Sequence, residues 1–316
     1  MSLLLRRSPL VLALLALAAL APAAEDDEAA RRRLDENLDP LLGWLMASYL
    51  PGGHAQADGV IFLPSDSDAE SSGGEREIGQ HEASFSAAQR IAINARAGVL
   101  IGASYGLLGF DDEAGILPDQ LHRVGVDIGG WYSPTPRLLL WAQAQPSLRS
   151  DFDQVDGDAF RVPAAVIAAY TFNSRFTLVG GLISLGLRED NLVLPIVGAW
   201  WRPTFAWNVV LTPIFATVDY GRADSRWRFY ATIQASGGEY QLADDDAGED
   251  VSLRYRDGRV RIGTRCKLNH RWSLDAGVGA AFWRQVEYDL EDEDAEPEPI
   301  DIDPAPFAAL GLTARW

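Results

Sequence analysis

The feature that most constrains this chain is a regular alternation of apolar and polar residues, which begins at about residue 83. In residues 272–280, Trp, Leu, Ala, Val and Ala fall on one face, and Ser, Asp and two Gly fall on the other. Successive side chains of a β-strand point to opposite faces, so a period of two predicts strands. We therefore expect an all-β fold. The same alternation recurs in residues 124–129, 227–236, 260–266 and 307–316.

The alternating segments are about ten residues long, whereas an ordinary globular strand averages about five or six. About ten tilted residues is the span of a membrane strand. Short turns at one end and long loops at the other are typical of a transmembrane antiparallel up-and-down β-barrel. The short connections are residues 94–96, 133–136, 173–174, 223–225 and 268–270, and the long ones are 110–120, 150–159, 241–250 and 290–304.

The strand count depends on residues 206–221. Two crossings of the membrane, with a reversal near Pro213, keep all the long loops on one side, and one kinked strand is the alternative. The first interpretation gives thirteen strands, and residues 57–64 are a candidate for one more. Because single-chain bacterial barrels have even counts, we expect about 12 to 14 strands.

The start of the chain is typical of an export signal. Arg6 and Arg7 precede an apolar run at 11–20, and a small-x-small site follows at 21–23. The apolar run is too short to span a bilayer. We interpret residues 1–23 as a signal peptide that is removed after export.

Residues 24–82 are expected to form an N-terminal periplasmic helix and a linker, ahead of a barrel at 83–316. Residues 64–82 are polar, which is typical of a linker. A helix is predicted at 25–50, ending before Pro51-Gly52-Gly53, because leucines recur three and four residues apart. These leucines are Leu34, Leu38, Leu41, Leu42 and Leu45.

The formal net charge is −18 at pH 7, which argues against nucleic acid as a partner. The acidic residues gather in the long connections, for example at 244–250. Carboxylates in such a run could bind divalent cations such as Ca²⁺, although the spacing is not that of an EF-hand loop. A solvated, self-repelling loop is the favoured interpretation.

The sequence indicates no enzyme active site. The four histidines, His54, His81, His122 and His270, have no metal-ligand spacing, and His122 is interpreted as a hydrogen-bonding residue at the rim. No Gly-x-Ser-x-Gly motif is present. We therefore predict no catalytic residue, no bound metal and no cofactor.

The polar faces of the strands carry many charged side chains. An arginine facing lipid near the midplane would cost about 2–4 kcal/mol, so these residues are predicted to face the lumen. They are interpreted either as a pore lining or as a packed charge network that fills a narrow barrel. The candidates are Arg123, Asp127, Arg161, Arg228, Gln234, Arg259, Arg261, Arg265 and Asp275.

The chain ends on an alternating segment whose last residue is Trp316, with Leu312 and Leu310 on the same face. A terminal aromatic with alternating apolar residues resembles the assembly signal of outer-membrane barrels. The resemblance implies recognition by the barrel insertion machinery.

Residues spread over 83–316 resemble a family of uncharacterised outer-membrane β-barrels, domain of unknown function 6268. The resemblance implies a barrel in the bacterial outer membrane, in contact with its lipid. It implies no activity. The residues that carry it are 117–123, 131–134, 150–152, 193–195, 201–203, 237–240 and 255–257, together with the terminal strand.

Two functions remain open. The first is a passive channel or transporter for small solutes, with an arginine-rich lumen partly neutralised by Asp127 and Asp275 and therefore a preference for anions. The second is a structural or adhesive surface barrel with acidic, cation-binding loops and no transport activity. A soluble, lipocalin-like barrel is a third interpretation, which recovery without detergent would reveal.

Overall fold

The computed structural model describes residues 53–68, 76–112, 117–153, 157–187, 192–222, 225–242, 251–290 and 299–316. The predicted signal peptide at 1–23 and the predicted helix at 25–50 lie outside these residues. Within the described ranges, no helix is long and apolar enough to cross a bilayer.

The described residues form β-strands almost throughout, with one short 3-10 helix at Gly157–Ala159. The strands are β1 (Gly53–Phe62), β2 (Ser65–Asp68), β3 (Arg76–Asn94), β4 (Ala97–Asp112), β5 (Gln120–Thr135), β6 (Leu138–Ala144), β7 (Ser147–Ser150), β8 (Phe160–Arg161), β9 (Ala164–Asn173), β10 (Phe176–Ser184), β11 (Val193–Trp201), β12 (Trp207–Leu211), β13 (Phe215–Tyr220), β14 (Trp227–Gln241), β15 (Val251–Lys267), β16 (Trp272–Leu290), β17 (Ile300–Ile302) and β18 (Ala305–Arg315).

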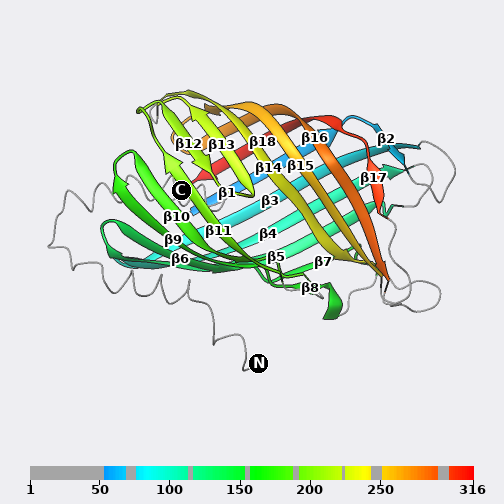
Figure 1. The fold of residues 1–316 in the computed structure, drawn as a ribbon, viewed down its shortest axis with the longest axis horizontal. Coiled ribbons are helices and arrows are strands. Elements are labelled where there is room, and N and C mark those ends of the chain that lie inside the picture. The colour runs from blue at the N-terminus through cyan, green and yellow to red at the C-terminus, as the bar shows by residue number, and fades with distance from the viewer. Residues whose placement is uncertain are drawn as a thin grey trace.

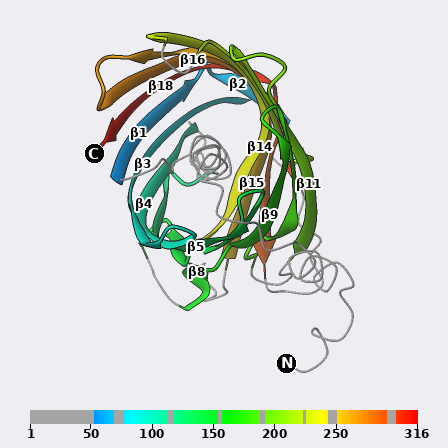
Figure 2. The ribbon, with the colours of Figure 1, turned by 90° about the vertical axis from the view of Figure 1, so that its left-hand side faces the viewer.

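These segments make one closed antiparallel barrel of 14 strands, because β1 pairs with β18 and shuts the sheet (Figures 1 and 2). In four places a strand is broken into two segments: β1 and β2, β6 and β7, β8 and β9, and β17 and β18. Each break contains a proline, which cannot donate to the backbone ladder. The prolines are Pro64, Pro146, Pro163 and Pro304.

The barrel confirms the expected fold and the upper end of the expected strand count. Residues 206–221 cross twice, as β12 and β13, with the reversal at 212–214. The extra strand is β1, in the region where residues 57–64 were the candidate.

The barrel begins earlier than the predicted boundary at residue 83. β1 starts at Gly53 and pairs with both β18 and β3, and β3 itself starts at Arg76. The start of β3 resembles a linker in sequence because Gln80 and Glu82 point into a polar lumen. The start of β3 therefore lacks the alternation of apolar and polar residues from which the boundary at residue 83 was predicted.

At the end of the barrel that carries the C-terminus, side chains close the short hairpins. Asn94 Oδ1 accepts hydrogen bonds from the backbone N–H of residues 96 and 97 at 2.8 and 2.9 Å. Asn269 does the same in its turn, and Asn173 Oδ1 accepts one such bond, from the backbone N–H of residue 175. Such local hydrogen bonds favour tight reversals, which explains why these connections are short.

The outer face is apolar. On β16, Val278 is 56% exposed, and on β15 the alternate residues Val260 and Ile262 are 41% and 58% exposed. Exposed aromatic side chains surround the short-turn end of the barrel, as in the aromatic girdles of membrane barrels. These are Tyr132, Phe172, Trp201, Phe205, Trp207, Tyr220, Trp227, Trp272 and Trp316.

The wall is uneven in height. β14, β15 and β16 contain 15, 17 and 19 residues, whereas β12 and β13 contain 5 and 6. Beyond the short β12–β13 hairpin, the far end of β14 meets β7, where Gln241 pairs with Ser150 (Figure 1). The long strands therefore extend well past the short ones at the long-loop end.

Candidate functional site

The lumen is the candidate site, because the strands place all nine predicted polar residues on the inner face. Arg259, Arg261 and Arg265 alternate along β15 with the exposed Val260 and Ile262. The register with the neighbouring strands carries the same inward face to β14 and β16, which hold Arg228, Gln234 and Asp275. On the opposite wall this face includes Arg123, Asp127 and Arg161.

Arg259 anchors a charge cluster in the long-loop half of the lumen. It donates from Nη1 to Glu82 Oε2 at 2.7 Å and from Nε to Asp257 Oδ2 at 2.8 Å. The Arg259 side chain is 8% exposed and that of Asp257 is fully buried. Glu82 lies on β3, separated from β15 by β16, β18 and β1, so this ion pair spans the lumen.

The same cluster extends to β2 and β16. Arg284 donates from Nη2 to Gln80 Oε1 at 2.8 Å and from Nη1 to Ser65 Oγ at 2.6 Å. The Tyr255 hydroxyl lies 3.0 Å from the same Gln80 oxygen and 2.6 Å from Asp257. A connected, largely satisfied network of this kind fixes the relative positions of these strands.

A second cluster lies nearer the short-turn end and centres on Asp275. This carboxylate accepts hydrogen bonds from Arg261 Nη2, from Arg265 Nε at 3.1 Å and from the Tyr230 hydroxyl at 2.7 Å. Arg265 also stacks over the Tyr230 ring at 4.8 Å. Asp275 therefore pairs with two arginines of the inner face.

Hydrogen bonds continue from this cluster to the other wall. Arg265 Nη1 lies 3.3 Å from Asp219 Oδ1, and Asn208 Nδ2 lies 3.5 Å from Asp219 Oδ2. Asn208 Oδ1 accepts a hydrogen bond from the indole N–H of Trp200. This series of hydrogen bonds links the charged residues of β15 to the inward-facing indole of Trp200 on β11.

Asp127 differs from the expectation. It accepts hydrogen bonds from Gln143 at 3.4 Å and Gln145 at 2.7 Å instead of pairing with an arginine. The guanidinium groups of Arg123 and Arg228 make no hydrogen bond or ion pair with another described residue. The lumen wall consequently keeps positive charge that its own described carboxylates do not pair.

Arg161 closes the seam between β8 and β14. Its Nη2 donates to Glu239 Oε1 at 2.6 Å, and the two side chains are only 3% and 2% exposed. This ion pair joins the strands at the place where the short β12–β13 hairpin leaves the wall low. Arg161 is therefore better described as holding the wall together than as lining open space.

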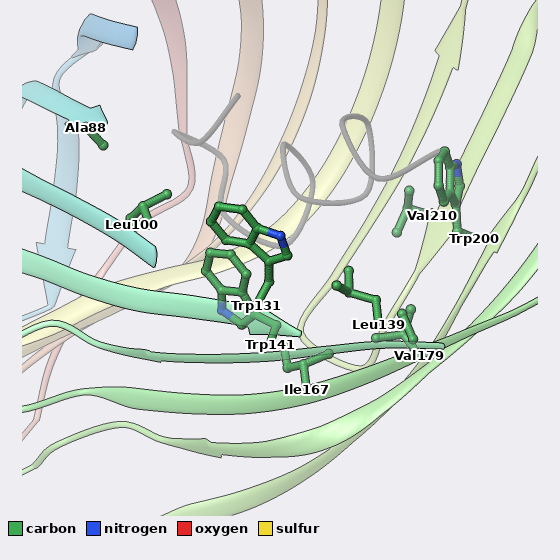
Figure 3. Close-up of a cluster of buried hydrophobic side chains, with 10 residues drawn as sticks. Ala88, Leu100, Trp131, Leu139, Trp141, Ile167, Val179, Trp200 and Val210 are labelled. Atoms are coloured by element: carbon green, nitrogen blue, oxygen red, sulfur yellow. The ribbon is translucent and has the colours of Figure 1, made fainter. Parts of the chain in front are cut away.

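The lumen also contains an apolar surface that the sequence analysis missed. Trp131, Leu139, Trp141, Val179 and Trp200 point inward from four strands, β5, β6, β10 and β11, in the short-turn half of the barrel (Figure 3). We call this surface the apolar arc. Its other members are Ala88, Leu100, Ile167, Ala169 and Val210.

The missed lumen residues had a signal in the alternation. Asp257 has the same parity as Arg259 and Arg261, but it falls beside a register shift between Arg256 and Gly258. Glu82 lies in the stretch interpreted as a linker, and Asp58 lies in residues 57–64, the candidate for one more strand. Most of the apolar arc could not be found from alternation, because β9, β10 and β11 are apolar on both faces where they carry it.

The described residues offer no group of three or more His, Cys, Asp or Glu side chains that could hold a metal ion. His122 bonds to the Tyr105 hydroxyl at 2.9 Å, which matches its interpretation as a rim residue. The acidic run at 244–250, the candidate for divalent cations, lies outside the described ranges.

A family model described as "Domain of unknown function (DUF6268)" matches residues 56–297. No curated protein matches the chain. Among solved structures, an outer membrane channel from Pseudomonas putida F1 is 11% identical, with 84% of this chain and 97% of that chain covered and a TM-score of 0.43. A TodX deltaS2S3 mutant monoaromatic hydrocarbon channel is 13% identical, with 85% and 91% covered and a TM-score of 0.40. The KdgM porin is 7% identical, with 83% and 99% covered and a TM-score of 0.35.

Proposed function

Because this chain belongs to the family described as domain of unknown function 6268, a description that states no activity, we propose its function from the barrel itself. The proposal is a bacterial outer-membrane channel through which small solutes pass passively, with a preference for anions. A signal peptide at 1–23 and assembly by the barrel insertion machinery belong to the same proposal.

One observation carries the proposal: a charged inner wall lies behind an apolar, aromatic-edged outer face. The outer face suits lipid, because exposed apolar side chains such as Val278 are stable against lipid tails. A charged side chain at the same place would cost about 2–4 kcal/mol. The inner charges need water or partners. A closed barrel with this division supplies a polar path across a bilayer.

The anion preference follows from the charge left on the wall. Asp275 and Asp219 pair with Arg261 and Arg265, whereas Arg123 and Arg228 add positive charge that makes no hydrogen bond or ion pair with a described carboxylate. The acidic loops extend into bulk salt, where a Debye length of about 8 Å screens them. The narrow lumen is therefore expected to dominate selectivity.

Planar-bilayer recording under a salt gradient tests the proposal. Discrete current steps with a reversal potential of the anion-selective sign are expected. Arg228→Glu should shift the reversal potential toward cations, because it reverses a charge on the lumen wall without breaking an ion pair. Arg271→Glu, at an exposed turn, is the matched control and should leave selectivity unchanged.

Silence from inserted, heat-modifiable protein would overturn the channel and favour the structural or adhesive barrel. Steps with cation preference, unaffected by Arg228→Glu, would show that this wall does not line the conducting path.

A further inference from the structure

Two arginines lie directly opposite each other on neighbouring strands in the long-loop half of the barrel. Arg123 on β5 and Arg149 on β7 pair in register, so their side chains project from the same, inner face. We call these two residues the opposed arginines. The guanidinium group of Arg161 on β8 also lies close enough to act on the charge of Arg149. Like charges that face each other across two strands destabilise the pairing, so this arrangement requires a counter-charge.

The described residues do not supply that counter-charge. Arg149 has one hydrogen bond to a described residue, from Nε to Ser147 Oγ at 3.3 Å, although only 9% of the arginine is exposed. Arg123 Nε is buried with no hydrogen-bond partner among the described residues. The neighbouring carboxylate, that of Glu239, already accepts a hydrogen bond from Arg161 at 2.6 Å. A buried charge is costly unless it is paired, so the opposed arginines favour binding of an anion.

The charge cluster around Arg259 cannot neutralise the opposed arginines. Its two carboxylates, those of Glu82 and Asp257, both pair with Arg259. Arg284 brings a second guanidinium group to the same cluster through Gln80. Two negative and two positive formal charges therefore cancel there, and the charge of the opposed arginines is left over on the inner face.

A glycine leaves space beside the opposed arginines. A Cβ on Gly238 of β14 would lie 3.4 Å from Arg149 Nη1 and 3.5 Å from the Tyr240 hydroxyl, so these two donors border the same small space. Arg123 and Arg149 both lie close enough to Tyr240 to interact electrostatically with its hydroxyl group. Two guanidinium groups and one phenol therefore converge on one part of the inner wall.

We propose that Arg123, Arg149 and Tyr240 form a binding site for the oxyanion group of a small solute. Guanidinium groups present parallel N–H donors that match the oxygens of a phosphate or a carboxylate. The Tyr240 hydroxyl is a further donor, and Gly238 leaves room for an oxygen beside it. The site rests on the proposed function only for its role in transport, where it would hold an anion on its way through the lumen.

Calorimetric titration of the full mature barrel, folded in detergent, tests the site. Inorganic phosphate, acetate and chloride are added separately as sodium salts at constant ionic strength. Saturable binding of phosphate or acetate is expected, with affinity at least about tenfold higher than for chloride, because chloride cannot accept from several donors through separate oxygens.

Variants assign the binding to the proposed residues. Arg123→Gln/Arg149→Gln should weaken oxyanion binding at least about tenfold, because it removes both charged donors. Tyr240→Phe keeps the ring and removes only the hydroxyl, so it should weaken binding by a smaller factor without affecting folding. Arg256→Gln is the matched control: this arginine lies at a similar height on the outer face and is 55% exposed, and its loss should leave the affinity unchanged.

Absence of saturable phosphate and acetate binding to heat-modifiable protein would overturn the proposal. Binding that survives both Arg123→Gln/Arg149→Gln and Tyr240→Phe would overturn it too, and so would equal affinity for chloride, which indicates only a general positive potential. Failure of the channel is a separate result. A protein that binds phosphate but gives no current steps keeps the site and loses the channel, whereas current steps without oxyanion binding keep the channel and remove the site.

Discussion

At the scale of single residues, Asp275 shows how one carboxylate organises a lumen wall. It receives Arg261, Arg265 and the Tyr230 hydroxyl together. Glycine makes room for the cluster: a Cβ on Gly277 would lie 2.6 Å from Arg261 Nε and 3.0 Å from the Tyr230 hydroxyl. The cluster thus requires a glycine at position 277 as well as the charged side chains.

Asp275→Asn is expected to lower the free energy of unfolding by about 1–3 kcal/mol, because it leaves Arg261 without its counter-charge and Arg265 with Asp219 alone. The figure is moderate because Arg261 and Arg265 are 23% and 39% exposed, and water screens the loss. Urea titration of liposome-folded protein measures it. Asp127→Asn is the matched control, since its partners are glutamines, and it should cost clearly less. Equal losses would show that the ion pairs of Asp275 add nothing beyond hydrogen bonding.

At the scale of strands, the alternation of faces decides what each position tolerates. The outward residues of β16 face lipid and the inward ones face the charged lumen. Two adjacent residues of the strand are therefore in different environments. One bulge lies in the pairing of β15 with β16, where the register shifts between Arg256 and Gly258. Trp283, on the β16 side of this shift, has a φ of 52°, and Gly237, which pairs with Arg256, has a φ of 143°. Beyond this level the outward side chains include Arg254, Arg256 and Glu287, so the bulge marks where the apolar belt ends.

Val278→Arg should destabilise the inserted barrel by about 2–4 kcal/mol, because it places a charge on the lipid face. Gln234→Arg introduces the same side chain on the inner face of β14, where water and carboxylates are available, and should cost much less. Unfolding in urea from liposomes compares the two. If both variants lose the same free energy, the assignment of the two faces is wrong.

At the scale of the whole molecule, the sequence predicted the architecture better than the site. Alternation sufficed for the barrel, for the lumen position of Arg259, Arg261 and Arg265, and for the double crossing at 206–221. It failed for β1 and the start of β3, where inward polar residues hide the pattern. It could not predict that Arg259 reaches Glu82 across the lumen, because such contacts depend on how the sheet closes.

Closure itself gives a prediction. Trp316 exchanges backbone hydrogen bonds with Gly53, and its indole N–H donates to Gln89 Oε1 at 3.1 Å, so it fastens the last strand to the first. Deleting Trp316 should reduce the fraction of folded barrel in the outer membrane, measured as heat-modifiable migration on gels. Trp316→Phe, which keeps an aromatic end, should restore most of it. An undiminished yield after the deletion would remove the proposed assembly role.

The uneven height of the wall has a consequence for the surrounding lipid. The β12–β13 hairpin turns at 212–214, and its tip is apolar, with Pro213 and a 42% exposed Ile214. Eight tilted residues from Trp207 to this tip rise only about 19 Å, against about 25 Å for the apolar band of such barrels. This shortfall is a hydrophobic mismatch on one side only, and the bilayer beside β12 and β13 has to thin to meet it. The bilayer is therefore expected to be locally thinned at one fixed position on the circumference of the barrel. Lipids there are expected to be less ordered, and association with a neighbouring protein of similarly short span is favoured at this position.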